Sequence, residues 1–290
     1  MSIKNHTELR NRELLMFKDQ VIWITGASSG IGEALALEFA KRGAKLILSS
    51  RNEHSLRAVA QKCEAISCDA NASYVLPMDV TDEDGLPAKV EQAKAHFGKI
   101  DLLINNAGIS QRSSFLVTDM ATYRKLFEVD VFGQIALTKL VVPIMLQQGS
   151  GHVAVTASVA GKIGVPFRTG YCAAKHAVMG FFDSLRSELA HQNIRVTTIT
   201  PGYIHTNISA NAVSGDGTAF GKTDSSIAGG MSAGECARIV VNGLQAGKPE
   251  IAVGKGIEMH TLWIKRLFPK MLFKLMQTQF HKSQKVEGFK

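Results

Sequence analysis

The chain has little cysteine, and no arrangement of it suits a disulfide framework or a metal site. Only four cysteines occur in 290 residues, and none forms a CxxC pair or a Cys/His ligand spacing. Histidine and carboxylate patterns of the HExxH or EF-hand type are missing too. We therefore expect reduced, packed thiols and no metal ion.

Long apolar runs are also missing. The first 20 residues, MSIKNHTELRNRELLMFKDQ, lack the apolar core of roughly 7–15 residues that a signal peptide needs. No stretch approaches the roughly 18 apolar residues of a spanning helix. The expected location is cytoplasmic, with peripheral attachment to the inner membrane face left open.

The positive charge is concentrated at one end of the chain. The 33 Lys and Arg residues exceed the 25 Asp and Glu residues by 8. Residues 255–290 hold eight basic and two acidic residues, or +6, which leaves +2 for the first 254 residues. A body with so little net charge and no reading motif predicts no nucleic-acid partner.

Seven short apolar runs alternate with amphipathic stretches, one of which is a long predicted helix over 122–148. Each run is rich in Val, Ile and Leu, as strands buried on both faces are. The runs are 21–25, 45–50, 73–80, 100–105, 152–158, 194–200 and 250–254. This alternation predicts an α/β fold, with a doubly wound, Rossmann-type parallel sheet of about seven strands and helices on both faces of a single domain.

A glycine-rich turn, TGASSGIG over 25–32, directly follows the first predicted strand. Glycine lets a pyrophosphate approach the backbone N–H groups, and the dipole of the following helix favours that anion. A tight turn without a ligand is the alternative. The predicted cofactor contacts here are Gly26, Ser28, Ser29, Gly30, Ile31 and Gly32.

The end of the second predicted strand, LSSRN over 48–52, contains no carboxylate. An Asp or Glu usually holds a free ribose 2′-hydroxyl, whereas a 2′-phosphate favours an arginine. Arg51, with Ser49 and Ser50 as further donors, therefore predicts NADP(H) rather than NAD(H). The alternative is that Arg51 is an ordinary surface residue.

Tyr171 and Lys175 lie four residues apart on a predicted helix, so their side chains share one face. Ser158 ends a predicted strand thirteen residues before Tyr171. Together with the glycine turn, these residues resemble the short-chain dehydrogenase/reductase family. The matching elements span 21–206 in the family's order and are TGASSGIG, Asp79-Val80, NNAG at 105–108, Ser158, YCAAK at 171–175, and Pro201-Gly202 with Thr206.

Within the family, GKIGVPFRTGYCAAKHA and YIHTNISANAVSGDG resemble the membrane-associated reductases close to the hydroxysteroid dehydrogenases. The resemblance implies that Tyr171 exchanges a proton with the substrate oxygen while hydride is transferred, and that Ser158 stabilises the developing oxyanion. It implies that Lys175 binds the nicotinamide ribose, and a cationic lysine there favours the tyrosinate. The further cofactor contacts that it implies are Asp79, Val80, Asn106, Ala107, Gly108, Pro201, Gly202, Ile204 and Thr206.

One position departs from the family's pattern. Where the family usually has an asparagine that holds a relay water behind the lysine, the segment EVDVFG places Asp130. An ionised carboxylate donates no hydrogen bond, but it can pair with Lys175. We expect a working relay with a shifted pH dependence and count Asp130 among the catalytic residues. The alternative is a replacement without consequence.

These motifs divide the chain into three parts. Residues 1–18 are predicted to be a solvated N-terminal lead-in, residues 19–254 an NADP-binding catalytic domain, and residues 255–290 a basic amphipathic extension. Within the domain, residues 203–232 are rich in Gly, Ser, Thr and Asn, which is typical of a substrate lid or a disordered insertion.

The C-terminal extension has a helical pattern that Pro269 is expected to kink or divide. Its apolar face contains Ile264, Phe268, Met271, Leu272 and Leu275, and its basic stripe contains Arg266, Lys270 and Lys274. Three arrangements fit: a roof packed over the substrate cleft, a helix in the interface of an anionic membrane, or a dimer contact.

The expected function is hydride transfer between NADP(H) and a carbonyl or alcohol group of a small apolar substrate. Two alternatives remain: a cofactor-binding sensor or scaffold with negligible turnover, and an epimerase or dehydratase that uses the same Tyr-Lys pair. The resemblance also implies a homodimer or homotetramer formed through helices over 122–148 and 170–191.

Overall fold

The computed structural model describes residues 17–222 and 225–287. Its main sheet has seven parallel strands in the order β3-β2-β1-β4-β5-β6-β9. They are β1 (Val21–Thr25), β2 (Lys45–Ser49), β3 (Ser73–Val75), β4 (Leu102–Asn105), β5 (Gly151–Thr156), β6 (Ile194–Pro201) and β9 (Glu250–Val253). The predicted doubly wound α/β fold is confirmed.

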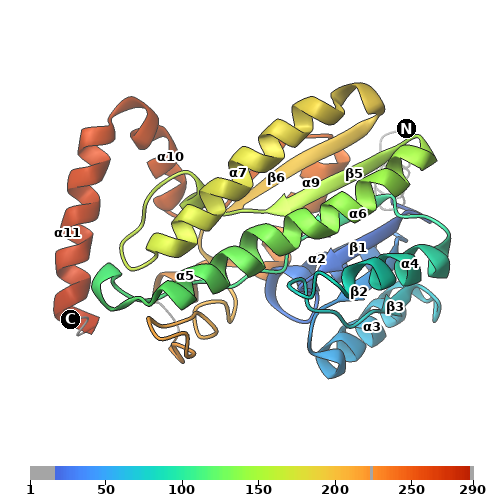
Figure 1. Ribbon diagram of the computed structural model, residues 1–290, viewed down its shortest axis with the longest axis horizontal. Helices are drawn as coiled ribbons and strands as arrows, with labels where there is room; N and C mark the ends of the chain where they lie inside the picture. The colour runs from blue at the N-terminus through green and yellow to red at the C-terminus, as the bar shows by residue number, and fades with distance from the viewer. Residues whose placement is uncertain (1–16, 223–224, 288–290) are drawn as a thin grey trace, which may run out of the picture.

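Helices cover both faces of the sheet (Figure 1). One face carries α2 (Gly30–Ala40), α3 (Glu53–Ser67) and α9 (Ala233–Gln245). The other carries α4 (Leu86–Phe97), α6 (Gly133–Gln148) and α7 (Thr169–Leu189). The chain order reverses between β1 and β4, which puts the topological switch point, and with it the expected ligand crevice, at the carboxyl ends of these two strands.

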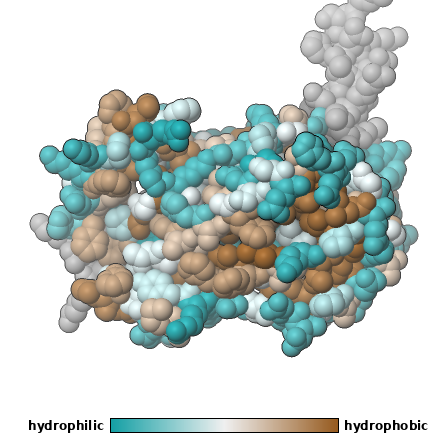
Figure 2. Space-filling view, turned by 45° about the horizontal axis from the view of Figure 1, so that its top comes forward, coloured by the Kyte–Doolittle hydropathy of each residue, from teal (hydrophilic) through white to brown (hydrophobic). Residues whose placement is uncertain are grey.

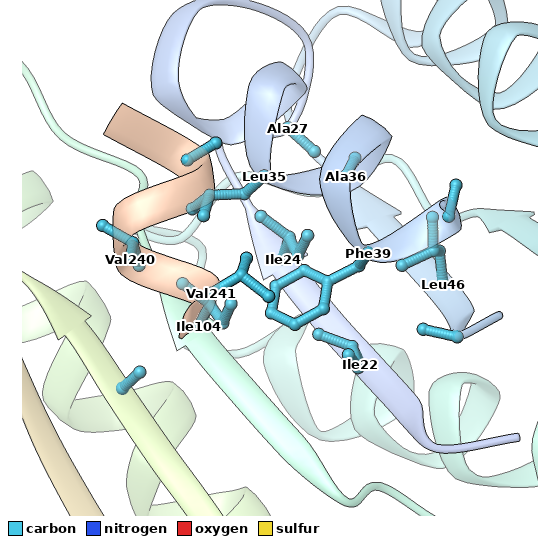
Figure 3. Packing of buried hydrophobic residues seen from close by; sticks show 14 of the residues in the cluster. Ile22, Ile24, Ala27, Leu35, Ala36, Phe39, Leu46, Ile104, Val240 and Val241 are labelled. Carbon is cyan, nitrogen blue, oxygen red and sulfur yellow. The ribbon is translucent and has the colours of Figure 1, made fainter. Parts of the chain in front are cut away.

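The core between α2, α9 and the sheet holds the glycine turn in place. Figure 3 shows Phe39 of α2 packed among Ile22 and Ile24 of β1 and Val241 of α9, all fully buried. Burial of a side chain of this size stabilises the fold by about 1.5–3 kcal/mol. The turn between β1 and α2 is therefore fixed by the packing at both of its ends.

Two predicted elements need correction. The strand predicted over 73–80 ends at Val75, and Pro77, which has no N–H to donate to a ladder, follows closely. The long helix predicted over 122–148 is α5 (Met120–Phe127), a π-helical turn (Glu128–Phe132) and α6. Such π turns interrupt the regular rotation of side chains and often occur at functional sites.

The expectation that no stretch is apolar enough to span a membrane also needs correction, because within the described chain Met120–Gln148 meets that criterion by length and composition. Of its most apolar window, 56% is buried inside the protein, as in a core helix.

The ends of the domain also differ from the prediction. Residues 1–16 of the predicted lead-in lie outside the described part, and Phe17 is not solvated, because it is buried edge-on against Phe39 at 5.0 Å. The predicted lid contains β7 (Ile204–His205), α8 (Ser225–Ala228) and β8 (Met231–Ser232), and β7 pairs with β8. The C-terminal extension forms α10 (Glu258–Leu267) and α11 (Pro269–Glu287), which begins at the predicted break, Pro269.

Candidate active site

A cavity of about 940 Å³ opens at the carboxyl ends of the central strands. Most of the predicted site residues line it: Gly26, Ser28, Ser29, Gly30, Ile31, Arg51, Asp79, Val80, Asn106, Ala107, Gly108, Ser158, Tyr171, Lys175, Pro201, Gly202, Ile204 and Thr206. Two predicted site residues, Gly32 and Asp130, are not in its wall.

The backbone of the glycine turn lets a ligand approach closely. Gly26 and Gly30 have φ angles of +65° and +61°, which other residues rarely adopt. A Cβ on Gly32 would lie 2.2 Å from the carbonyl oxygen of Gly26, so that position has room only for glycine. The turn is tied to β4 because Thr25 Oγ1 accepts hydrogen bonds from the N–H groups of Asn106 and Ala107, both at 3.0 Å.

The N-terminus of α2 fits a dinucleotide pyrophosphate. The side chain of Ser29, its N-cap residue, makes no capping hydrogen bond, so the first backbone N–H groups of α2 have no side-chain partner from the cap. They lie beside the cavity at the positive end of the helix dipole, which is a favourable environment for phosphate.

Arg51 lies at the outer end of the cavity. Its side chain is 72% exposed, and its Nη1 is 3.9 Å from Asp79 Oδ2, a long ion pair in solvent that holds the guanidinium weakly. Glu53 also lines the cavity, but its carboxylate accepts a hydrogen bond from Arg57 Nε at 2.9 Å. The carboxylate nearest to the end of β2 is therefore already engaged.

Tyr171, Lys175 and Ser158 meet at the inner end of the cavity. Lys175 Nζ lies 5.7 Å from the centre of the Tyr171 ring and donates a hydrogen bond to the Thr156 carbonyl oxygen at 3.1 Å. Ser158 hydrogen-bonds to the Tyr171 phenol, and its Oγ also accepts from Ala160 N at 3.1 Å. The three side chains that the sequence separates by up to seventeen residues thus form one group.

The charge balance at Tyr171 corrects one expectation. Burial raises the pKa of Tyr171 above its usual value, although Lys175 acts in the opposite direction. Asp130 adds to the increase, whereas the hydrogen bond from Ser158 and the charge of Arg168 reduce it. Lys175 thus favours the tyrosinate as predicted, but desolvation is the larger effect, so the phenol is protonated at neutral pH.

Asp130 lies directly behind Lys175 and is completely buried. Its Oδ1 accepts a hydrogen bond from Ile109 N at 2.7 Å, and its Oδ2 is 3.5 Å from Lys175 Nζ. Burial raises the pKa of this carboxyl group, against the opposing charge of Lys175. The predicted ion pair is therefore present, and the π turn aims the carboxyl group at the lysine.

Gln111 does not line the cavity, but it contacts the helix start that carries Tyr171, and no sequence motif marks it. It is fully buried, and its Oε1 accepts hydrogen bonds from the N–H groups of Gly170 and Tyr171 at 2.7 and 3.3 Å. Gln111 also forms a β-bridge with Val213 in the lid. It thus joins the lid to the start of α7, and no local motif marks a glutamine that caps a helix 59 residues away.

Several further residues of the cavity wall are marked by no sequence motif. We call the part of the wall that carries Ile163, Val165, Ile208 and Ile227 the apolar end of the cavity. The other unmarked lining residues include Arg168, Tyr203, Asn207, Asn211 and Glu258. Among the described residues, no three His, Cys, Asp or Glu side chains are grouped so that they could hold a metal ion.

The parallel sheet, the glycine turn and the Ser-Tyr-Lys group define a dinucleotide-dependent oxidoreductase class. The family model for short chain dehydrogenases matches residues 20–217, and the chain belongs to this family. Its members use a nicotinamide cofactor.

Curated relatives match over most of the chain. The chain is 37% identical over 277 residues to "Dehydrogenase/reductase SDR family member 7B" of Mus musculus. This alignment covers 95% of this chain and 86% of the relative. It is 40% identical over 225 residues to "Dehydrogenase/reductase SDR family member 7" of Homo sapiens, with 77% and 66% covered.

Solved structures share the fold. Levodione reductase superposes with a TM-score of 0.72 at 28% identity, covering 84% of this chain and 99% of that one. A short-chain dehydrogenase/reductase from Burkholderia phymatum, solved in complex with NAD, gives a TM-score of 0.77 at 24% identity, with 88% and 96% covered.

Proposed function

We propose that this chain is an NADP(H)-dependent oxidoreductase that interconverts a carbonyl and an alcohol on a small apolar substrate. The observation that carries the proposal is the meeting of Tyr171, Ser158 and Lys175 in one cavity with the glycine turn. The residues proposed to bind the cofactor and those proposed to transfer the proton therefore line the same cavity.

Tyr171 acts as the general acid in reduction. Because burial raises its pKa, the phenol holds its proton at neutral pH and can give it to the substrate oxygen. The residues of the glycine turn and Lys175 would hold the cofactor, which when bound would supply a hydride for the carbonyl carbon, or accept one in the reverse direction. Ser158 donates a hydrogen bond to the oxygen as its negative charge develops.

Lys175 has two tasks in this proposal. Its ammonium group stabilises the tyrosinate left after proton transfer, and it binds the ribose of the cofactor. Thr156 and Asp130 hold it in place from behind. Asp130 is then a positioning residue that acts through Lys175 and does not touch the substrate.

Arg51 supports NADP(H) over NAD(H). Its exposed guanidinium stands at the cavity's outer end, while Glu53 is engaged by Arg57. We expect Arg51→Ala to weaken NADPH binding about tenfold or more and to leave NADH binding within twofold. Fluorescence titration of both cofactors tests this. Equal losses for the two cofactors would remove Arg51 as the reader of the 2′-phosphate.

The far, apolar end of the cavity supports an apolar substrate. Ile163 and Val165 come from the loop between β5 and α7, and Ile227 comes from the predicted lid, so the lid segment helps to shape this end. A panel of carbonyl compounds and alcohols of graded size, assayed with NADPH, NADH and their oxidised forms, tests the proposal.

The Tyr171→Phe variant helps to distinguish an oxidoreductase from the alternative functions, which are a cofactor-binding sensor and an epimerase or dehydratase. We expect turnover to fall by about 10²-fold or more while NADPH binding stays within threefold, because only the proton donor is lost. A cofactor-binding sensor would show NADPH binding without turnover on any panel member. An epimerase or dehydratase would convert substrate without net consumption of NADPH.

We also propose a homodimer or homotetramer through α6 and α7. An apolar band crosses the face in Figure 2, where Figure 1 places these two helices. Phe132, just before α6, and Leu146 within it are 52% and 38% exposed. Light scattering after size exclusion measures the mass.

A further inference from the structure

The two C-terminal helices, α10 and α11, are attached to the domain at three points. Glu258 Oε1 accepts hydrogen bonds from Tyr203 N at 3.3 Å and from Gly256 N at 3.2 Å. Leu272 is buried in a cluster with Val159 and Ile163. The helix pair is therefore packed on the domain, at the apolar end of the cavity that Ile163 also lines.

The third attachment lies near the end of α11. The ring of Phe280 stacks on Phe167 with 5.1 Å between ring centres. Leu272, Met276 and Phe280 recur every four residues, so they form the stripe by which α11 contacts the domain.

The helix pair leaves a large apolar surface uncovered. Six large apolar side chains on the helix pair are between 45% and 71% exposed: Trp263, Leu267, Phe268, Met271, Phe273 and Leu275. Trp263 and Leu267 are four residues apart and share the outer face of α10. Figure 2 shows apolar and polar residues interleaved at its left end, where Figure 1 places the pair. A cluster of this size on a protein surface marks an interaction site.

The same surface carries basic side chains without counter-charges. Within the described chain, the exposed Arg266, Lys270 and Lys274 make no ion pair, whereas Lys255, just before α10, pairs with Glu235 at 2.5 Å. No acidic residue occurs between 259 and 286. The outer face of the pair is therefore both apolar and cationic.

We propose that α10 and α11 form a docking surface for an anionic lipid bilayer. Exposed Trp and Phe suit the boundary between headgroups and acyl chains, and Lys and Arg suit anionic headgroups. A second copy of the chain fits less well, because a twofold contact through this surface would place the two basic groups against each other. The basic side chains therefore favour anionic lipid headgroups over a second copy of the chain.

Docking in this way would turn the apolar end of the cavity toward the bilayer, because Ile163 both lines the cavity and contacts Leu272. If the proposed oxidoreductase function holds, an apolar substrate dissolved in lipid would reach the site without crossing water. Membrane docking itself does not depend on that function.

The test is cosedimentation of the full chain with vesicles of phosphatidylcholine, with and without about 30 mol% phosphatidylserine. We expect binding to the anionic vesicles that weakens as salt rises from about 50 to about 500 mM. Lys270→Gln with Lys274→Gln should reduce binding about 25-fold, since each cation near the surface contributes about fivefold. Lys139→Gln with Lys248→Gln makes the same charge change elsewhere and should leave binding within twofold.

A second set of variants tests the contribution of the exposed apolar side chains to vesicle binding. Trp263→Gln with Phe273→Gln should lower binding about tenfold or more, whereas Ile66→Gln on α3 should not. The four side chains replaced on the helix pair in these tests are all exposed, so folding should be retained, and circular dichroism checks this. Vesicle binding that is absent, or equal in all variants, would overturn the proposal. So would conversion of an oligomer into a monomer by Trp263→Gln with Phe273→Gln, without any vesicle binding by the parent chain.

Discussion

Replacing Asp130 with asparagine tests whether its charge tunes the catalytic phenol. Asp130 Oδ2 lies 3.5 Å from Lys175 Nζ, which lies 5.7 Å from the Tyr171 ring centre, so the carboxylate is within about 9 Å of that ring. At an effective dielectric constant of about 20, a unit charge at that distance contributes about 2 kcal/mol. The amide oxygen of the new side chain would still accept the hydrogen bond from Ile109 N, so the chief change is the lost charge.

The expected result is an easier ionisation of Tyr171. Asp130 raises the pKa of Tyr171, so its neutralisation should increase the tyrosinate population about tenfold or more. In alcohol oxidation, which requires the tyrosinate, the acid limb of the kcat/KM profile should move to lower pH by about one pH unit. In carbonyl reduction, the alkaline loss of activity should begin at correspondingly lower pH.

The assay is kcat/KM against pH in both directions for the parent chain, Asp130→Asn and Glu128→Gln. Glu128 is an exposed carboxylate in the same π turn, so Glu128→Gln makes the same charge change away from Lys175. Profiles of Asp130→Asn and the parent that coincide would refute the reasoning. They would mean that Asp130 carries no charge at the pH of catalysis, or that this charge does not reach Tyr171.

Three further predictions concern stability, helix capping and the glycine turn. Burial lowers the pKa of His152 from 6.5 to about 3, so its contribution to stability is complete above about pH 6.5 and decreases as pH falls toward 3. Urea titrations should show about 2 kcal/mol less stability at pH 5 than at pH 7.5 from this residue, and His152→Gln should remove that part of the dependence. Gln111→Leu should lower kcat about tenfold with little change in NADPH affinity, because the start of α7 loses its acceptor, and Gln111→Glu, which restores an acceptor, should recover most of kcat. Equal kcat values for both variants would contradict this positioning role. Gly32→Ala should weaken NADPH binding about tenfold or more, because its Cβ would collide with the Gly26 carbonyl oxygen, and unchanged fluorescence titrations would show that the turn can adapt.

Several features of the site were predictable because they are local. Strands buried on both faces need consecutive apolar residues, and the seven runs in the sequence show this pattern whatever lies around them. The glycine turn needs positive φ angles at Gly26 and Gly30, and the identity of the residue largely decides whether such angles are accessible. Tyr171 and Lys175 share a helix face by spacing alone.

Other features depend on residues distant in sequence and on the degree of burial, which only the tertiary structure decides. Lys175 predicts a lowered pKa for Tyr171, but desolvation by the folded chain is larger and raises it. Gln111 contacts the start of α7, next to Tyr171, only because the fold brings these distant residues together. The C-terminal pattern allowed three arrangements, and packing of Leu272 and Phe280 on the domain determines which face is left exposed. Periodicity follows from the geometry of one helix or strand, whereas burial and charge proximity follow from contacts between elements.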